Sequence, residues 1–154
     1  MGSFTKLTYH VVFSTKYRRK KITDKIQERL YEYMGGITRN LKGRLIQIGG
    51  IEDHVHLLLH LPANKAVSDS IREIKANSSK WLNEAYEFRY RFEWQKGYGA
   101  FTVSHSQIES VRNYINNQRE HHRTKTFGEE LIELLRRHEI QFDRKYLFEA
   151  EYVG

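Results

Sequence analysis

The chain contains no cysteine and only one proline, Pro62. The absence of cysteine excludes disulfide bonds, thiolate metal sites and cysteine nucleophiles, and it fits the reducing cytoplasm. No apolar run approaches the roughly 20 residues that span a bilayer, and the first residues lack the apolar segment of a secretory signal. We therefore expect a cytoplasmic protein without a membrane segment.

Acidic residues are the minority among the charged ones, with 19 Asp and Glu against 26 Lys and Arg, which gives a formal net charge of +7. Such an excess favours a polyanionic partner, and nucleic acid is the usual one. Aromatic residues make up 13% of the chain and include ten tyrosines. Their faces suit the stacking of unpaired bases, although most are expected in the core. Composition thus favours nucleic-acid binding without indicating a reaction.

Apolar periodicity predicts alternating strands and helices in a single domain of residues 1–154. Strands are expected at residues 5–14, 45–48, 54–61 and 98–104, and helices at residues 23–41, 66–86, 106–121 and 126–138. Residues 86–97 fit neither pattern. The order of the elements favours an α+β fold of the ferredoxin-like type, an antiparallel sheet with helices packed on one face.

Local signals mark where several of these elements begin or end. Thr23 is suited to cap the first helix. The spacing of a capping box occurs twice, at residues 106–109 and 126–129. A turn is expected at residues 49–53, where two glycines precede an acidic pair.

The strand expected at residues 54–61 separates two kinds of side chain, because successive residues point to opposite faces. One face is wholly aliphatic and carries Val55, Leu57, Leu59 and Leu61. His54, His56 and His60 project from the other face. His54 and His56 lie roughly 6.5–7 Å apart along the strand, close enough for both imidazoles to bind one cation. The same pattern also fits histidines on a solvated face that bind no metal.

The helix expected at residues 106–121 places Tyr114, Gln118 and His121 along one edge of its apolar stripe. Tyr114 and Gln118 are an i, i+4 pair and can therefore reach the same ligand. Gln118 offers an amide oxygen, and Tyr114 offers a phenol, which is a better leaving group than an alkyl alcohol. A half-buried packing role for Tyr114 fits the same spacing. We interpret His121 and His122 as a solvated helix end rather than a further metal site.

Taken together, these two elements resemble those of a known family. Residues 53–59, Asp-His-Val-His-Leu-Leu-Leu, resemble the histidine–hydrophobe–histidine signature of the HUH nucleases. Residues 111–118 resemble the helix of the single-tyrosine transposases of the simplest bacterial insertion sequences. Residues 9–18 and 94–101 also resemble that family, and the likeness runs from about Leu7 to Phe148.

The resemblance implies that His54, His56 and Gln118 bind Mg²⁺ or Mn²⁺, and that Tyr114, on a helix towards the C-terminus, is the nucleophile. It implies attack of Tyr114 on a DNA phosphate, which leaves a 5′-phosphotyrosine and a free 3′-hydroxyl. Members of the family are homodimers in which the tyrosine helix often serves the partner's histidine pair. They recognise hairpins folded from single strands at the element ends, and they excise and insert the element as single-stranded DNA.

A basic run is the strongest candidate for contact with DNA phosphates. Its members are Lys16, Arg18, Arg19, Lys20 and Lys21. Arg72 and Lys75 on the second helix are weaker candidates. Glu52 and Asp53, beside the histidine pair, can be extra ligands or bases, or simply turn residues.

Three other functions remain open at this stage. A domesticated relative that processes chromosomal palindromic repeats would use the same catalytic residues. A non-catalytic single-strand binding domain would place aromatics such as Tyr9 or Tyr98 on an open sheet face and give Tyr114 no role. A zinc hydrolase would use all three histidines of the strand, but no residue supplies its general base convincingly.

Overall fold

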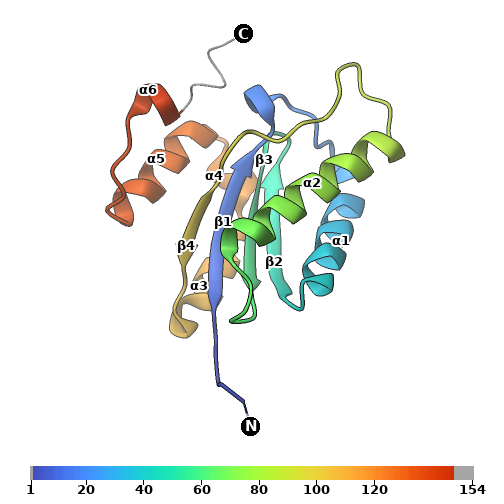
Figure 1. The fold of residues 1–154 in the computed structure, drawn as a ribbon. Coiled ribbons are helices and arrows are strands. Elements are labelled where there is room, and N and C mark those ends of the chain that lie inside the picture. The colour runs from blue at the N-terminus through green and yellow to red at the C-terminus, as the bar shows by residue number, and fades with distance from the viewer. Residues whose placement is uncertain (1, 148–154) are drawn as a thin grey trace.

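The computed structural model describes residues 2–147, so Met1 and residues 148–154 of the expected domain lie outside the described residues. The strands are β1 (Thr8–Ser14), β2 (Arg44–Ile51), β3 (His54–His60) and β4 (Gly99–Thr102). The helices are α1 (Asp24–Asn40), α2 (Val67–Ala85), α3 (Ile108–Asn116), α4 (Gln118–His121), α5 (Phe127–Arg137) and α6 (Arg144–Leu147). Two 3-10 turns, η1 (Lys16–Arg18) and η2 (His105–Gln107), join them (Figure 1).

The four strands form one antiparallel sheet in the order β2-β3-β1-β4. The two central strands, β1 and β3, pair over their whole length, with Val12 opposite His56 and Ser14 opposite His54. The histidine pair therefore lies at the middle of the sheet, where both neighbouring strands hold its backbone in place.

Helices α1 and α2 cover one face of the sheet (Figure 1). The aliphatic row of β3 packs there with Leu30 and Met34 of α1 and Ile71 and Ile74 of α2. The predicted fold class and the predicted aliphatic face of β3 are both confirmed. Burial of these side chains is the main stabilising contribution to the fold, at about 25 cal/mol per Å² of apolar area.

Helices α3, α4 and α5 lie on the opposite face of the sheet (Figure 1). A second apolar cluster joins Val12 and Phe101 of the sheet to Phe127, Leu131 and Leu134 of α5. The sheet therefore has helices on both faces and not on one face as the sequence predicted, because the apolar stripe of α5 also needs a surface to cover. Among the described residues, none of the helices combines the length and the apolar character of a membrane span.

The predicted turn at residues 49–53 is wrong in its extent. Gly49 and Gly50 belong to β2, and only Glu52 and Asp53 form the turn between β2 and β3. Gly49 serves a different purpose, since a Cβ atom there would overlap the backbone carbonyl oxygen of Ile115. The missing side chain lets α3 approach the sheet closely.

The predicted capping box at residues 106–109 is also wrong. Ser106 lies inside η2, α3 begins at Ile108 without a side-chain cap, and the helix is interrupted at Asn117. The caps at Thr23 and at Thr126 are confirmed, and Thr126 forms a complete capping box with Glu129.

Residues 86–98 connect α2 to β4 as a long loop that crosses the end of β1. Trp94 anchors this loop, since its ring lies edge-on to Phe13 and to Phe92 at 4.8 Å in each case. The amide of Gln95 also donates to the carbonyl oxygen of Ser14. The loop is therefore fixed against the sheet by both packing and hydrogen bonds.

Candidate metal and nucleophile site

His54 and His56 point away from the aliphatic face of β3 and are fully buried. Their burial results from α4 and α5, which cover this part of the sheet. The rings lie 5.1 Å apart between centroids. A solvated histidine pair, one of the two interpretations of the sequence pattern, is therefore wrong.

Gln118 begins α4 and reaches the same place. Its side-chain oxygen Oε1 lies 2.8 Å from Nε2 of His54, and the residue is buried. The structure thus brings together the three residues expected to bind a metal. The sequence predicted one continuous helix with Gln118 near Tyr114. In the structure the two residues are near the same cluster, but Tyr114 belongs to α3 and Gln118 to α4, because the helix is interrupted at Asn117.

Glu130 of α5 lies at the centre of the cluster, and sequence reasoning missed it. Its Oε1 atom lies 3.0 Å from Nε2 of His56 and 3.0 Å from Nε2 of His122. Its Oε2 atom accepts a hydrogen bond from Nε2 of Gln118 at 3.0 Å. The only signal was an acidic residue next to the apolar stripe of α5, and acidic residues are ordinary in the first turn of a helix.

His122 also belongs to the cluster, so its predicted place at a solvated helix end is wrong. Its side chain is only 2% exposed, because the chain turns back towards the sheet after α4. Nδ1 lies 2.6 Å from the carbonyl oxygen of Lys125, which leaves Nε2 facing Gln118 and Glu130 at 3.0 Å each. The neighbouring His121 stays on the surface, 4.6 Å from the ring of Tyr114 between centroids.

The donor atoms of four residues lie within 4.8 Å of one another, and these residues are His54, His56, His122 and Glu130. Oε1 of Gln118 joins the same group. Three imidazole nitrogens, a carboxylate and an amide oxygen form a set that divalent transition metals accept. The cluster is therefore a group able to bind a metal ion.

The charge states of Glu130 and His56 suit that purpose. Burial would raise the pKa of Glu130, but hydrogen bonds to His122 and His56 outweigh it and lower the pKa, so the carboxylate is ionised. Burial lowers the pKa of His56 to about 4, which keeps this imidazole neutral near pH 7. Burial also lowers the pKa of His122, but the hydrogen bond to Glu130 reverses the effect and raises it. A neutral imidazole is the form that binds metals.

Further residues orient the histidine pair through contacts to the Nδ1 atoms of the two rings. Oδ1 of Asp53 lies 2.8 Å from Nδ1 of His54, and Nε2 of His10 lies 2.8 Å from Nδ1 of His56. These contacts leave both Nε2 atoms facing the cluster, as partners of metal-binding histidines commonly do. Glu52 turns instead to Arg119, at 3.2 Å. Asp53 is therefore a supporting residue rather than part of the donor group.

Tyr114 of α3 is half-buried beside the cluster, and its hydroxyl donates a hydrogen bond to Oε2 of Glu130. Its ring lies 5.8 Å from that of His56 and 6.1 Å from that of His10, in edge-on contacts. Burial and the negative charge of Glu130 raise the pKa of Tyr114 well above its ordinary value. One chain thus brings the tyrosine, the histidine pair and Gln118 into a single site.

His60 lies at the far end of β3, where Nδ1 is 2.7 Å from the hydroxyl of Thr8. It does not join the cluster, so the three-histidine arrangement of a zinc hydrolase is absent from the described residues. Tyr9 packs on the core beneath α1 and α2, so its side of the sheet is covered by helices. The open aromatic sheet face of a simple single-strand binder is therefore not found there.

The sequence model of the family described as "Transposase IS200 like" matches residues 3–118, which is more than half of the chain. The chain belongs to this family. The transposase is 29% identical over 117 residues to the transposase for insertion sequence element IS200 of Salmonella typhimurium, covering 73% of this chain and 76% of the relative. It is 25% identical over 122 residues to the ISDra2 transposase TnpA of Deinococcus radiodurans, covering 76% and 87% respectively.

Two solved structures resemble the transposase. One is a crystal structure of a Deinococcus radiodurans R1 protein assigned as a transposase, with a TM-score of 0.63 and 26% identity over 77% of this chain and 95% of that one. The other is a REP-associated tyrosine transposase bound to a REP hairpin, with a TM-score of 0.56 and 16% identity over 75% of this chain and 70% of that one. The latter likeness shows a shared fold.

The family match ends within the site. His54, His56, Tyr114 and Gln118 lie inside the matched residues, whereas His122 and Glu130 lie beyond them. The matched range therefore covers four residues of the site and not the other two.

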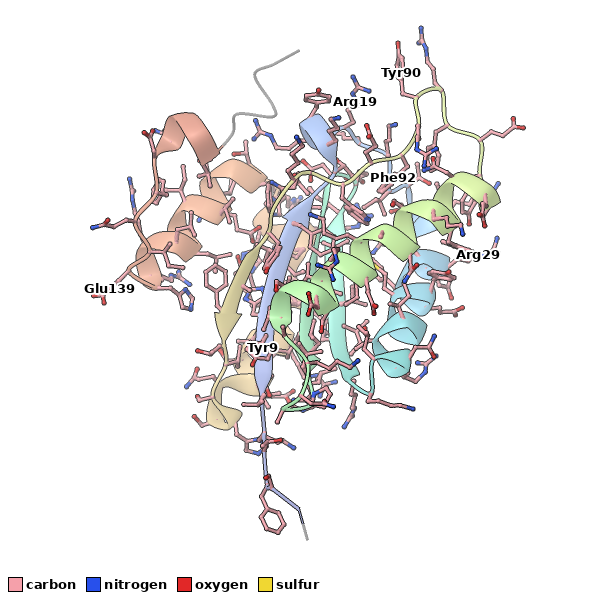
Figure 2. All side chains as sticks on the ribbon, in the orientation of Figure 1. Tyr9, Arg19, Arg29, Tyr90, Phe92 and Glu139 are labelled. Atoms are coloured by element: carbon pink, nitrogen blue, oxygen red, sulfur yellow. The ribbon has the colours of Figure 1, made fainter. Side chains whose placement is uncertain are left out.

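The basic run of the transposase divides into two parts. Lys16 and Lys21 tie η1 to the loop at residues 86–98, through an ion pair with Glu93 and a hydrogen bond to the carbonyl oxygen of Tyr90. Arg19 lies over the ring of Tyr90 at 4.9 Å (Figure 2). These contacts give the run a defined shape on the surface.

Arg18 and Lys20 line a cavity of about 400 Å³, and His122, Arg123 and Lys125 line the same cavity. These two residues of the run are thus close to the cluster, and contact of the run with DNA stays a prediction. The side chain of Lys75, a weaker candidate for DNA contact, forms hydrogen bonds within the protein.

Lys75 donates to the carbonyl oxygens of Gln95 and Gly97 at 2.7 Å each, and burial lowers its pKa to about 8. Arg72, the other weaker candidate, is exposed and pairs with Asp69 at 3.0 Å.

Proposed function

We propose that the transposase cuts and rejoins single-stranded DNA at the ends of a mobile element through a covalent 5′-phosphotyrosine at Tyr114. One observation carries the proposal. The hydroxyl of Tyr114, Nε2 of His56 and the amide nitrogen Nε2 of Gln118 all contact the carboxylate of Glu130. A nucleophile and a metal-binding group therefore share one small volume.

In this proposal His54, His56 and Gln118 hold Mg²⁺ or Mn²⁺, with His122 and Glu130 as further donors. The two oxygens of Gln118 and Glu130 suit either ion, whereas three imidazoles favour Mn²⁺ over Mg²⁺. When bound, the ion neutralises charge on the scissile phosphate and helps to position it for in-line attack.

Two residues of the chain act in the cleavage step, Tyr114 as the nucleophile and Glu130 as the proton acceptor. The Tyr114 oxygen attacks the phosphorus atom, the bond from phosphorus to the 3′-oxygen breaks, and the departing oxygen takes a proton from water. The phenolic proton passes to Oε2 of Glu130, which already accepts it in a hydrogen bond. Because the pKa of Tyr114 is raised, the phenol needs such an acceptor.

Rejoining follows the reverse path. A 3′-hydroxyl attacks the phosphotyrosine and gives up its proton to the solvent, the bond from phosphorus to the Tyr114 oxygen breaks, and the phenol recovers its proton from Glu130. A phenol is a good enough leaving group for the step to be reversible, so the energy of the phosphodiester bond is retained without ATP.

We further propose DNA hairpins at the element ends as the partner of this cytoplasmic, single-domain protein. The net charge of +7 and the basic run support this, as does the REP hairpin bound by a tyrosine transposase of the same fold. We propose a homodimer whose active sites assemble within one chain. For Tyr114 to serve the partner's histidine pair, α3 would have to leave its place over Gly49.

In the test, the protein is incubated with labelled DNA stem-loops and Mn²⁺ or Mg²⁺. A covalent protein–DNA adduct is then detected on a denaturing gel. The wild type is expected to form an adduct that chelator abolishes, and Tyr114→Phe is expected to form none. An adduct of undiminished yield from Tyr114→Phe would exclude Tyr114 as the nucleophile, and an adduct that survives chelation would exclude the metal.

A further inference from the structure

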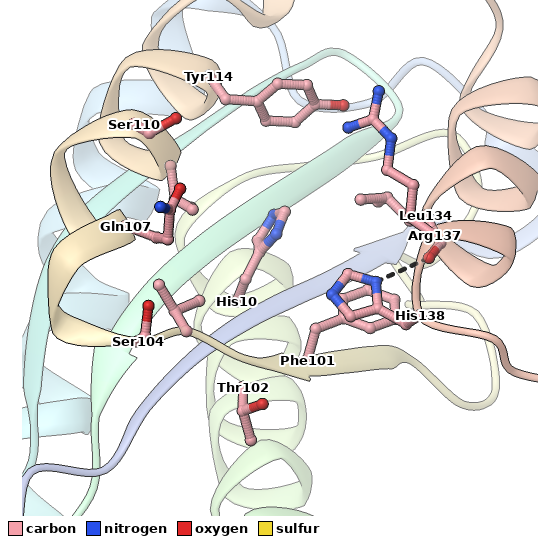
Figure 3. Close-up of a pocket in the computed structure, with 12 residues that line it drawn as sticks. His10, Phe101, Thr102, Ser104, Gln107, Ser110, Tyr114, Leu134, Arg137 and His138 are labelled. Atoms are coloured by element: carbon pink, nitrogen blue, oxygen red, sulfur yellow. Dashed lines mark hydrogen bonds between the residues drawn. The ribbon is translucent and has the colours of Figure 1, made fainter.

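A cavity of about 510 Å³ opens beside Tyr114, between β4 and the helices α3 and α5 (Figure 3). Its volume falls in the range of small-molecule binding sites. His10, Phe101 and Leu134 form its buried part. Its rim carries charged and polar residues that can bind a ligand.

Arg137, the last residue of α5, is the charged residue of this rim. Its guanidinium group points towards the hydroxyl of Tyr114 (Figure 3).

Three other cations near the site have acidic partners. Arg119 pairs with Glu52 at 3.2 Å, Arg123 with Glu120 at 3.2 Å, and Lys125 with Glu133 at 2.7 Å. Within residues 2–147 the structure gives the side chain of Arg137 no ion pair or hydrogen bond. A planar guanidinium left available next to a nucleophile suits the oxygens of a phosphate, which it can contact with two N–H groups at once.

The rest of the rim is neutral and polar. Two hydroxyls and an amide line the cavity, from Ser104 before η2, Gln107 at the end of η2 and Ser110 in the first turn of α3. Such groups both donate and accept hydrogen bonds, as the edges of an unpaired base require.

At the opposite wall, His138 stacks on Phe101 with 4.2 Å between ring centroids. Aromatic faces of this kind stack unpaired bases. A phosphate-binding cation, neutral polar groups and an aromatic wall thus surround one space next to the nucleophile.

We infer that this cavity binds one nucleotide of the single strand, a nucleotide that flanks the scissile phosphate. Arg137 contacts the phosphate, and Ser104, Gln107 and Ser110 face the base. The inference rests on the proposed strand-cutting function and adds a specificity determinant to it. The protein itself selects a base at the cleavage position, in addition to any selection made through the DNA hairpin.

The probe for the test is a pool of labelled DNA stem-loops with randomised loops and flanks. Covalent adducts formed with Mn²⁺ are isolated on a denaturing gel, and the attached strands are sequenced. The wild type is compared with Gln107→Ala, Ser110→Ala and Arg137→Ala. Arg136→Ala is the matched control, because Arg136 is the neighbouring exposed arginine of α5 and does not line the cavity.

For the wild type we expect a base preference at one position next to the cleaved phosphate. Gln107→Ala and Ser110→Ala should reduce that preference while leaving preferences elsewhere in the strand intact. Arg137→Ala should slow adduct formation about ten- to a hundredfold, as expected for loss of a hydrogen bond to a charged group. Arg136→Ala should keep the wild-type rate and preference.

The outcomes separate the two proposals. If the wild type forms no adduct, the proposed function fails. If the wild type forms the adduct but all variants keep its flanking-base preference, and Arg137→Ala matches Arg136→Ala in rate, the strand-cutting function stands and the nucleotide cavity is overturned. A loss of folding in Arg137→Ala is recognised by its melting temperature, and Gln107→Ala and Ser110→Ala then decide through the base preference alone.

Discussion

The hydroxyl of Tyr114 donates its hydrogen bond to the carboxylate of Glu130, a residue on a different helix and beyond the part of the chain that matches the family. The other oxygen of the same carboxylate lies 3.0 Å from both His56 and His122. One side chain thus connects the proposed nucleophile to the group able to bind a metal ion.

Replacing Glu130 is the most direct test of this connection. Glu130→Gln keeps the shape of the side chain but removes its charge, so Tyr114 loses its proton acceptor. We expect adduct formation to slow about 10²- to 10⁴-fold, the usual contribution of a general base. Single-turnover rates of adduct formation measure it, with the exposed Glu133→Gln as control. A faster rate for Glu130→Gln would show that Glu130 obstructs the site.

The adjacent histidines His121 and His122 form a matched pair for testing the metal site. Mn²⁺ should raise the melting temperature of the wild type, since a ligand that binds only the folded state stabilises it by RT ln(1 + [L]/Kd). His122→Ala should weaken Mn²⁺ binding about 10- to 100-fold, whereas His121→Ala should leave it unchanged. Equal Mn²⁺ affinity in both variants would remove His122 from the donor group.

Stability should depend on pH through the buried histidines. The pKa of His56 falls from 6.5 to about 4 in the folded protein, and that of His10 falls from 6.5 to about 3. Between those values and 6.5 the unfolded chain binds more protons than the folded one, so the free energy of unfolding rises with pH. The stabilisation is complete above about pH 6.5 and is lost as the pH falls towards 4.

The slope is about 1.4 kcal/mol per pH unit for each such histidine, partly offset by His122, whose pKa is raised. Denaturant unfolding in metal-free buffer measures it. His10→Phe should fold but show a shallower dependence than the wild type. A free energy of unfolding that is flat from about pH 5 to 7 would contradict the burial of neutral histidines.

The close approach of α3 to the sheet predicts a sharp difference between two glycines. Gly49→Ala should displace α3, because the new Cβ meets the backbone of Ile115, and both stability and adduct formation should fall. Gly36→Ala in α1 meets only the end of the Arg39 side chain, at 3.6 Å, and should stabilise the helix by about 0.5–1 kcal/mol. Wild-type adduct formation by a folded Gly49→Ala would show that the position of Tyr114 does not depend on this contact.

The alternation of β3 was predictable because it is a local property of a strand. It correctly divided the aliphatic residues from His54 and His56, and these aliphatic residues do meet the helices. Whether the histidines faced solvent could not be predicted, because that depends on which elements return to the second face of the sheet.

Glu130 and His122 were beyond sequence reasoning for the same reason. Both lie next to the cluster only because the chain breaks at Asn117, turns after α4 and packs the apolar stripe of α5 on Val12 and Phe101. The capping box of α5 could be predicted from the sequence, since it involves residues three positions apart. The surface on which α5 packs could not be predicted in this way.

His10 lies between the cavity beside Tyr114 and the metal-binding group. Its ring lines the cavity beside Tyr114, and its Nε2 atom contacts His56 of the metal-binding group. A nucleotide in the cavity and an ion in the cluster would therefore touch two ends of the same pair of imidazoles. Their binding is expected to be thermodynamically linked, so that DNA changes the affinity for the ion by the same factor by which the ion changes the affinity for DNA.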